Sequence, residues 1–257
     1  MFTSPGEIAF NIGSLSVHYY GICISVGIVV GLLVSYFICK KFYKDINPDV
    51  IFDVAIPVII GGIIGARLYY CGLMADYYSN HLLEILQIYK GGMSIHGGIY
   101  GGLVGGLLYA ENKKLPRLKL CDIFSFALIT GQIIGRWGNF FNSEAFGAPC
   151  NNFLQLYIPL EKRPAEFVYF EYFHPTFLYE SLLNILVLVS LFYILKKKPK
   201  DGTIFFAYLI LYSVVRIFIE TIRIDSAYSV MGAPIAIVVS LFLIFISIYW
   251  FLCLREV

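Results

Sequence analysis

Long apolar runs alternate with short polar segments along most of the chain. A helix that spans a membrane needs about 20 mostly apolar residues. Seven runs are predicted to be such helices, and they cover residues 17–39, 50–72, 93–110, 118–137, 175–195, 203–222 and 230–252. The third is rich in glycine and the weakest by hydropathy. The pattern predicts an all-α polytopic membrane protein, with residues 1–257 forming one integral membrane domain.

Composition agrees with this fold class and excludes others. Charged residues make up 14% of the chain, against about 25% in soluble domains. No segment is basic enough to predict nucleic-acid binding. The six cysteines form no CxxC pair and no cluster with histidine, so we expect no metal site and no disulfide framework.

The basic residues favour one orientation in the membrane. Eleven of the nineteen lie in alternate loops: Lys40, Lys41, Lys44, Lys113, Lys114, Arg117, Lys119, Lys196, Lys197, Lys198 and Lys200. The positive-inside rule makes these loops cytoplasmic, which predicts an outside N-terminus and a cytoplasmic C-terminus. No Lys or Arg precedes the first apolar run, so that run is expected to be a span and not a cleavable signal peptide.

Two long segments are then predicted outside. Residues 73–92 are amphipathic and are expected to lie along the membrane surface. Residues 138–174, rich in Pro, Asn and aromatic residues, are expected to form a small extracytoplasmic head.

Three arginines fall inside predicted spans: Arg67, Arg136 and Arg216. Intramembrane charge is costly and usually faces a cavity or a partner. All three fall in the outer half of their spans. Other polar residues reach the same level from the remaining helices, and these are Tyr19, Tyr20, His96 and His174. Each arginine alone can snorkel to the interface, but this shared level favours a common polar site.

The sixth span carries the sequence RIFIETIR, which places Arg216, Glu220 and Arg223 on one helical face. A structural ion-pair ladder is one interpretation. Two arginines against one carboxylate also leave positive charge, and Arg suits bidentate phosphate binding. A lipid phosphate at this level therefore fits the pattern.

Glycine pairs recur every four residues at 97/98, 101/102 and 105/106, which predicts a bare helical face for close packing. His96 comes just before this face, and a structural role and a role as general base both remain open. The segment HPTFLYES begins the fifth span, where His174, Tyr179 and Glu180 are expected to act as interface anchors more than as partners of the site.

The segment GRWGNFFNSEAFG resembles the signature G-R-x-G-N-F-x-N-x-E-x-x-G of the prolipoprotein diacylglyceryl transferases. All eight specified positions match: Gly135, Arg136, Gly138, Asn139, Phe140, Asn142, Glu144 and Gly147. The segments SIHGG, GARL, HPTFLYE and RxxxExxR, with Tyr20-Gly21, resemble the family's other blocks. The resemblance covers nearly the whole chain except about 148–172.

The resemblance implies that the chain moves the diacylglyceryl group of phosphatidylglycerol to the lipobox cysteine of a prolipoprotein signal peptide, on the outer side of the bacterial plasma membrane. It implies no metal or nucleotide cofactor. By position, the family's essential residues match Tyr20, His96, Arg136, Asn139 and Arg216. Arg136 and Arg216 are expected to bind the lipid phosphate, and His96, with Tyr20 sharing the task, is the candidate base.

Further substrate-binding residues are expected around this core. Asn139 and Glu144 are expected to orient the arginine or the lipid headgroup, and Glu220 and Arg223 to shape the opening. Asn142, Gly147 and Arg67 complete the expected binding set.

The alternative function is a transporter or channel for an anionic solute, with the arginines lining its path. That function predicts polar residues along the full depth or inverted repeats. The inner halves of the spans are nearly uncharged, and we find no repeat. A non-catalytic lipid-binding protein would explain the arginines but not His96.

Overall fold

A computed structural model describes the chain except residues 14, 89–90, 225–228, 231–232 and 257. Its long helices are α1 (Tyr19–Phe42), α2 (Val50–Leu73), α4 (Ile95–Asn112), α5 (Arg117–Phe141), α6 (Thr176–Lys196), α7 (Thr203–Ile222) and α8 (Ile235–Glu256). Each coincides with one predicted span to within a few residues. Positions 89–90 of the predicted outer segment and 231–232 of the seventh predicted span lie outside the described residues.

The polytopic membrane class is confirmed. Six of these helices are long and apolar enough to cross a membrane, counted over the described residues. The exception is α4, the predicted third span, which has 18 residues and whose glycines lower its hydropathy.

Short elements connect the helices. They are α3 (Ala75–Tyr78) and the 3₁₀ turns η1 (Leu82–Leu86), η3 (Leu160–Lys162) and η4 (Ala165–Phe167). Three antiparallel strand pairs are β1 (Ile8–Ile12) with β2 (Leu15–His18), β3 (Leu156–Tyr157) with β4 (Tyr172–Phe173), and β5 (Ser229–Val230) with β6 (Ala233–Pro234). The sequence analysis did not predict these strands, because most are too short for an alternating pattern to show.

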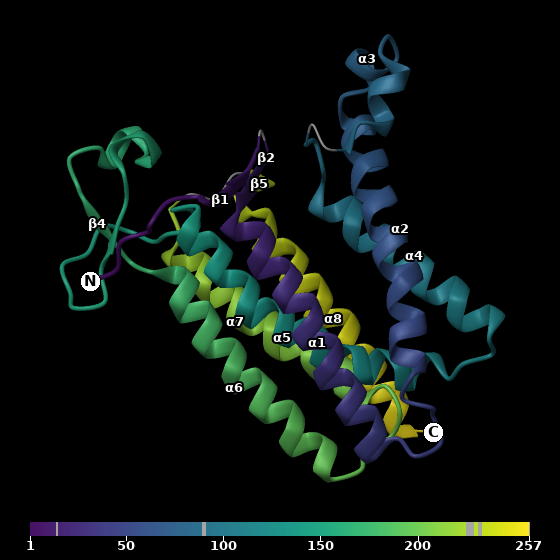
Figure 1. Cartoon of the computed structure of the whole chain (residues 1–257). Helices are drawn as coiled ribbons and strands as arrows, with labels where there is room; N and C mark the ends of the chain where they lie inside the picture. The colour runs from purple at the N-terminus through teal and green to yellow at the C-terminus, as the bar shows by residue number, and fades with distance from the viewer. Residues whose placement is uncertain (14, 89–90, 225–228, 231–232, 257) are drawn as a thin grey trace. The chain divides into compact units, whose positions relative to one another are not determined.

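The contacts divide the chain into two compact units (Figure 1), and each is described by itself. The first unit comprises Met1–Ser35 and Cys121–Val257, and the second is Tyr36–Leu120. In the second unit, α2 packs directly on α4 through glycine. A Cβ atom built on Gly61 or Gly65 would collide with the backbone of Gly101 or Gly97. This confirms the predicted close-packing face.

In the first unit, α1 lies against α5 with similar closeness, since a Cβ on Gly31 would lie 2.7 Å from the carbonyl oxygen of Ala127. Toward the start of α5, the buried Asp122 carboxylate accepts hydrogen bonds from the backbone N–H groups of Gly202 (2.7 Å) and Phe205 (2.8 Å). These are donors that the start of α7 would otherwise leave unpaired. Asp122 therefore fixes α7 to α5.

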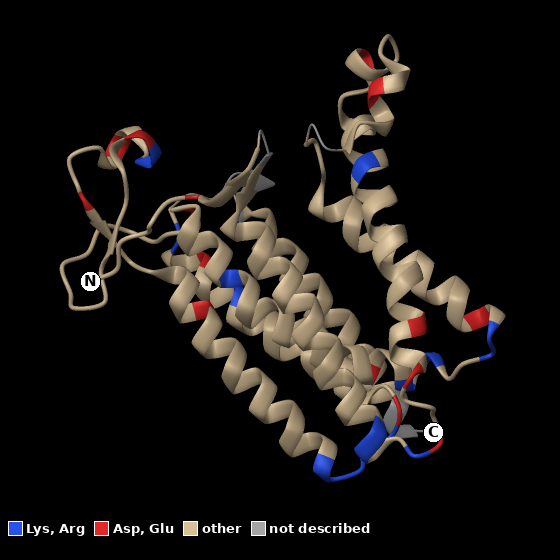
Figure 2. Ribbon diagram, in the orientation of Figure 1, with Lys and Arg blue, Asp and Glu red and all other residues tan. Residues whose placement is uncertain are grey.

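Charge is sparse over the helical surface of this unit and gathers near the ends of the helices, as at the end of α6 (Figure 2). Residues 142–174 form a small region of turns and short strands on the first unit. Its core is the buried cluster Phe146, Leu156, Ile158, Phe173 and Phe177. The chain start joins it: the Met1 ammonium donates to the Phe153 carbonyl (2.8 Å), and Phe2 pairs with Leu156.

Candidate active site

The signature segment ends α5 and folds back on it. The Glu144 backbone N–H donates to the Asn139 carbonyl (3.0 Å), and the Asn139 side-chain amide donates to Glu144 Oε1 (2.8 Å). Asn142 approaches the same carboxylate oxygen at 3.5 Å. Ser143 and Ala145 take φ angles of 49° and 55°, the left-handed conformation that reverses the chain. The turn therefore sets the Glu144 carboxylate over the end of the helix.

Two glycines of the signature allow close approach. A Cβ on Gly138 would lie 2.7 Å from the Tyr20 ring. A Cβ on Gly147 would lie 2.8 Å from Ile222 and 2.9 Å from His174. Since real Cβ atoms are not found so close to other heavy atoms, a side chain at either position would force its neighbour to move. Gly138 thereby seats Tyr20 against α5, and Gly147 lets the turn lie between the end of α7 and the start of α6.

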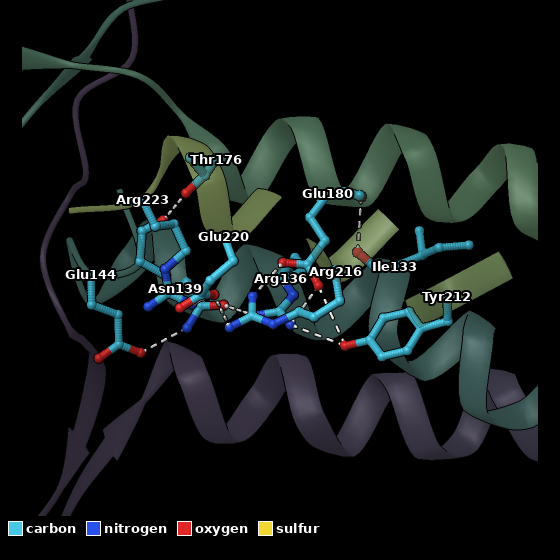
Figure 3. Close-up of polar contacts among 12 residues, drawn as sticks. Ile133, Arg136, Asn139, Glu144, Thr176, Glu180, Tyr212, Arg216, Glu220 and Arg223 are labelled. Carbon is cyan, nitrogen blue, oxygen red and sulfur yellow. Dashed lines mark hydrogen bonds and ion pairs between the residues drawn. The ribbon is translucent and has the colours of Figure 1, made fainter. Parts of the chain in front are cut away.

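The arginines of α5 and α7 meet at a carboxylate of α6 (Figure 3). Glu180 is 2% exposed. Its Oε1 lies 2.7 Å from Arg136 Nη2, and its Oε2 lies 3.4 Å from Arg216 Nη1. The Tyr212 hydroxyl joins them, 3.4 Å from Glu180 and 3.5 Å from Arg136. We call Arg136, Glu180, Tyr212 and Arg216 the arginine cluster.

The cluster extends along α7 and α5. Arg216 Nη2 lies 2.7 Å from Glu220, which is also 3.9 Å from Arg223 Nη1, so the predicted ion-pair ladder exists. Arg136 Nη1 donates to the Asn139 side-chain oxygen at 3.3 Å. The arginine cluster is therefore continuous with the Asn139–Glu144 turn.

Tyr20 belongs to the same site, because its ring packs against α5 at Gly138, the residue before Asn139. Its neighbour Tyr19 stacks on Phe141 with ring centroids 4.3 Å apart. The first unit thus brings together Tyr20, Arg136, Asn139, Glu144 and Arg216. Of these, Tyr20, Arg136 and Arg216 were predicted to lie at one level, and Asn139 and Glu144 were predicted from the family signature.

The expectation that Glu180 acts as an interface anchor is wrong, because this carboxylate is buried between two guanidinium groups. His174 and Tyr179 instead contact each other, with 3.1 Å between His174 Nδ1 and the tyrosine hydroxyl. Glu180 was considered from the sequence, but the anchor role was preferred because the residue lies near the start of its span. Nothing in the sequence distinguished Tyr212 from other membrane tyrosines.

Arg67 lies in the second unit and is 4% exposed. Its guanidinium donates to the backbone carbonyls of Glu84 (2.5 Å), Ile85 (2.8 Å), Gly91 (2.6 Å) and Gly92 (2.9 Å). These bonds hold the chain at residues 84–85 and 91–92 onto α2. A direct role of Arg67 in substrate binding stays a prediction.

His96 also belongs to the second unit. It lies in the first turn of α4, exposed, with its ring centroid 6.2 Å from that of Tyr69. Its place beside the arginine cluster therefore stays a prediction.

The arrangement is suited to hold an anion. Arg136 and Arg216 share Glu180, and Arg216 also contacts Glu220. Each guanidinium carries five N–H donors in a planar fork that matches phosphate oxygens. The groups are fixed by three different helices before any ligand arrives. Among the described residues, no group of three or more His, Cys, Asp or Glu side chains is arranged to hold a metal ion.

Known proteins resemble this chain over nearly its full length. The profile of the family described as prolipoprotein diacylglyceryl transferase matches residues 7–253. Proteins named phosphatidylglycerol–prolipoprotein diacylglyceryl transferase are similar: one from Nostoc sp. is 45% identical, covering 88% of this chain and 81% of its own length. One from Synechocystis sp. is 41% identical (99% and 92%), and one from Clostridium botulinum is 39% identical (95% and 94%). The chain therefore belongs to the prolipoprotein diacylglyceryl transferase family.

Proposed function

We propose that this protein transfers the diacylglyceryl group of phosphatidylglycerol to the thiol of the lipobox cysteine of a prolipoprotein, forming a thioether and releasing glycerol phosphate. The observation that carries the proposal is the arginine cluster, in which Arg136 and Arg216 converge on one buried carboxylate. The names of the relatives support the two substrates.

In the proposed step, the cysteine thiolate attacks the glycerol carbon that bears the phosphate. The S–C bond forms as the C–O bond to the phosphate breaks, and the electron pair leaves with glycerol phosphate. Negative charge grows on the departing phosphate, so Arg136 and Arg216 stabilise the transition state more than the ground state. No protein cysteine is needed, because the nucleophile belongs to the substrate.

The thiol must lose its proton before it attacks, since the thiolate is the nucleophile. His96 is our candidate for the base, and Tyr20 is the second candidate. Tyr20 is supported by its place in the first unit, where its ring lies against Gly138 of the signature segment.

The surrounding polar groups are proposed to position the lipid. Asn139 and Glu144 orient Arg136 and the headgroup, with Asn142 and Gly147 shaping the turn that carries them. Glu220 and Arg223 are proposed to form the opening of the active site at the end of α7. Arg67 is proposed to act on the lipid indirectly, through the predicted outer segment (residues 73–92).

The protein is proposed to lie in the bacterial plasma membrane with its N-terminus outside, its C-terminus in the cytoplasm and this site toward the outer leaflet. The alternating distribution of basic loops supports this orientation. An exported prolipoprotein presents its lipobox cysteine at that face.

The test is direct. Purified protein with phosphatidylglycerol and a lipobox peptide should yield a diacylglyceryl-modified cysteine by mass spectrometry and an equal amount of glycerol phosphate. Arg136→Ala and His96→Ala should abolish or strongly reduce both. The matched controls Arg117→Ala and His81→Ala change exposed residues and should keep activity.

Two failures have different meanings. The function is refuted if the unaltered protein forms no product under conditions where a characterised member of the family does. The site assignment alone is refuted if product forms at the normal rate in Arg136→Ala or His96→Ala.

A further inference from the structure

Three helices around the arginine cluster each carry a buried polar side chain that no protein group satisfies. They are Thr130 of α5 (7% exposed), Asn184 of α6 (0%) and Ser213 of α7 (1%). Within the described part of the chain, the two hydroxyl groups and both polar atoms of the Asn184 amide have no hydrogen-bond partner. Leaving such groups unpaired in an apolar interior destabilises a fold.

Two contacts between these helices set the heights of the three side chains. The Ser181 hydroxyl donates to the Ile133 carbonyl (3.0 Å), which sets the register of α6 against α5. One turn further along α6 is Asn184, and one turn back along the antiparallel α5 is Thr130. They therefore lie at the same height.

The contact between Glu180 and Arg216 sets the register of α6 against α7 in the same way. Asn184 follows Glu180 by one turn, and Ser213 precedes Arg216 by one turn. Asn184 and Ser213 thus lie about one helical turn, roughly 5.4 Å, from Glu180 and Arg216 along their helices. Thr130 lies six residues, roughly 9 Å, before Arg136 along α5, on the same side of the arginine cluster. We call Thr130, Asn184 and Ser213 the polar tier.

We propose that the polar tier binds the acyl-ester carbonyls of the donor phospholipid. The inference rests on the proposed function, in which the arginine cluster holds the lipid phosphate. In a diacyl phospholipid, the two ester carbonyls follow the phosphate immediately on the side of the membrane interior. Carbonyl oxygens only accept hydrogen bonds, and the tier offers two hydroxyl donors and an amide NH₂.

Such contacts would fix the glycerol between two anchors, the phosphate at the arginine cluster and the esters at the polar tier. The carbon attacked by the thiolate lies between these two anchors, so its position and its orientation relative to the thiolate are fixed. The tier is enclosed by α5, α6 and α7, so the carbonyls reach it only as these helices part around the lipid. The polar tier thereby selects lipids with ester-linked chains.

The test compares phosphatidylglycerol with its dialkyl ether analogue, which keeps the phosphate and the reacting carbon but lacks the carbonyls. The unaltered protein should prefer the ester lipid in kcat/KM by roughly tenfold for each hydrogen bond lost. Asn184→Leu and Ser213→Ala should lower kcat/KM for the ester lipid and have little effect on kcat/KM for the ether lipid. The ester-to-ether ratio of kcat/KM should therefore fall toward one.

Thermal stability separates this role from a structural one. An amide that only supports the fold would lower Tm when replaced, whereas Asn184→Leu should raise Tm, because an unpaired buried amide is exchanged for an apolar side chain of similar size. Ser247→Ala is the control, since this buried hydroxyl of α8 is also without a partner among the described residues. It should leave the ester-to-ether ratio unchanged.

The proposal is overturned if the unaltered protein uses both lipids equally well, or if Asn184→Leu keeps the full preference. In either case product still forms from phosphatidylglycerol, so the proposed function stands. Absence of product from both lipids would refute the function itself. A preference that persists in every variant of the tier would show that the tier binds only water.

Discussion

Replacing Glu180 by glutamine tests whether the two arginines depend on their shared carboxylate. Glutamine keeps the shape of the side chain but removes its charge. Its single amide oxygen can accept from only one of Arg136 and Arg216, and its NH₂ group then faces the other guanidinium. Both arginine side chains are mostly shielded from solvent, at 20% and 16% exposure, so water compensates little.

The expected magnitude follows from these contacts. Removing one partner of a buried ion pair costs about 3–5 kcal/mol, because the remaining charge stays buried. If about 3 kcal/mol of that appears as lost alignment of the arginines toward phosphate, kcat/KM falls by about a hundredfold. The remaining part of the 3–5 kcal/mol should appear as a loss of folding stability, measured as a lower Tm.

The assay is the transfer reaction on detergent-solubilised protein, with Tm measured on the same samples. Glu180→Asp keeps the charge one methylene further from the arginines and should recover part of the activity. Glu166→Gln removes an exposed carboxylate of η4 and should leave both activity and Tm unchanged. If Glu180→Gln keeps kcat/KM within twofold of the unaltered protein, Glu180 does not position the arginines.

Three other outcomes follow from the contacts of the first unit. Gly138→Ala should displace the Tyr20 ring, which the added methyl would approach to 2.7 Å, and lower transfer at least tenfold, measured as product formation at saturating lipid. Asp122→Asn should lower Tm, because one of the two backbone N–H bonds at the start of α7 loses its acceptor at a cost of about 1–3 kcal/mol. The Lys162 ammonium, through a hydrogen bond and its charge, holds the pKa of Glu7 below its ordinary value of 4.5, so this exposed contact stabilises the fold above that value and is lost as pH falls through the lowered pKa. The hydrogen-exchange protection factors of the strands near Glu7 should therefore fall below about pH 4.5, and Glu7→Gln should remove that step.

The sequence predicted the helices well because a membrane imposes a length and an apolar composition on each span. The glycine face of α4 was predictable for a similar reason, since its spacing of four residues is a local pattern. The joining of Met1 and Phe2 to residues 153–156 was not, because short strand contacts between distant segments leave no periodic signal.

The site was predictable where charge interrupts apolar sequence. Arg136 and Arg216 were found on that basis, as were Glu220 and its ladder. Glu180 was misjudged because it lies close to the start of its span, where an interfacial position is equally consistent with sequence. Only the register between α6 and α7 shows that this carboxylate faces inward.

The position of Glu180 explains how two arginines coexist in an apolar bundle before a lipid arrives. Two like charges held close together would repel strongly where water is scarce, and the shared carboxylate offsets that repulsion. Its contacts are unequal: Arg136 is held at 2.7 Å, whereas Arg216 is 3.4 Å from Glu180 and 2.7 Å from Glu220. Arg136 therefore holds Glu180 more closely than Arg216 does, and Arg216 is shared between two carboxylates. A phosphate that enters the cluster meets donors already aimed by three helices, so little reorganisation is required as charge develops on the leaving group.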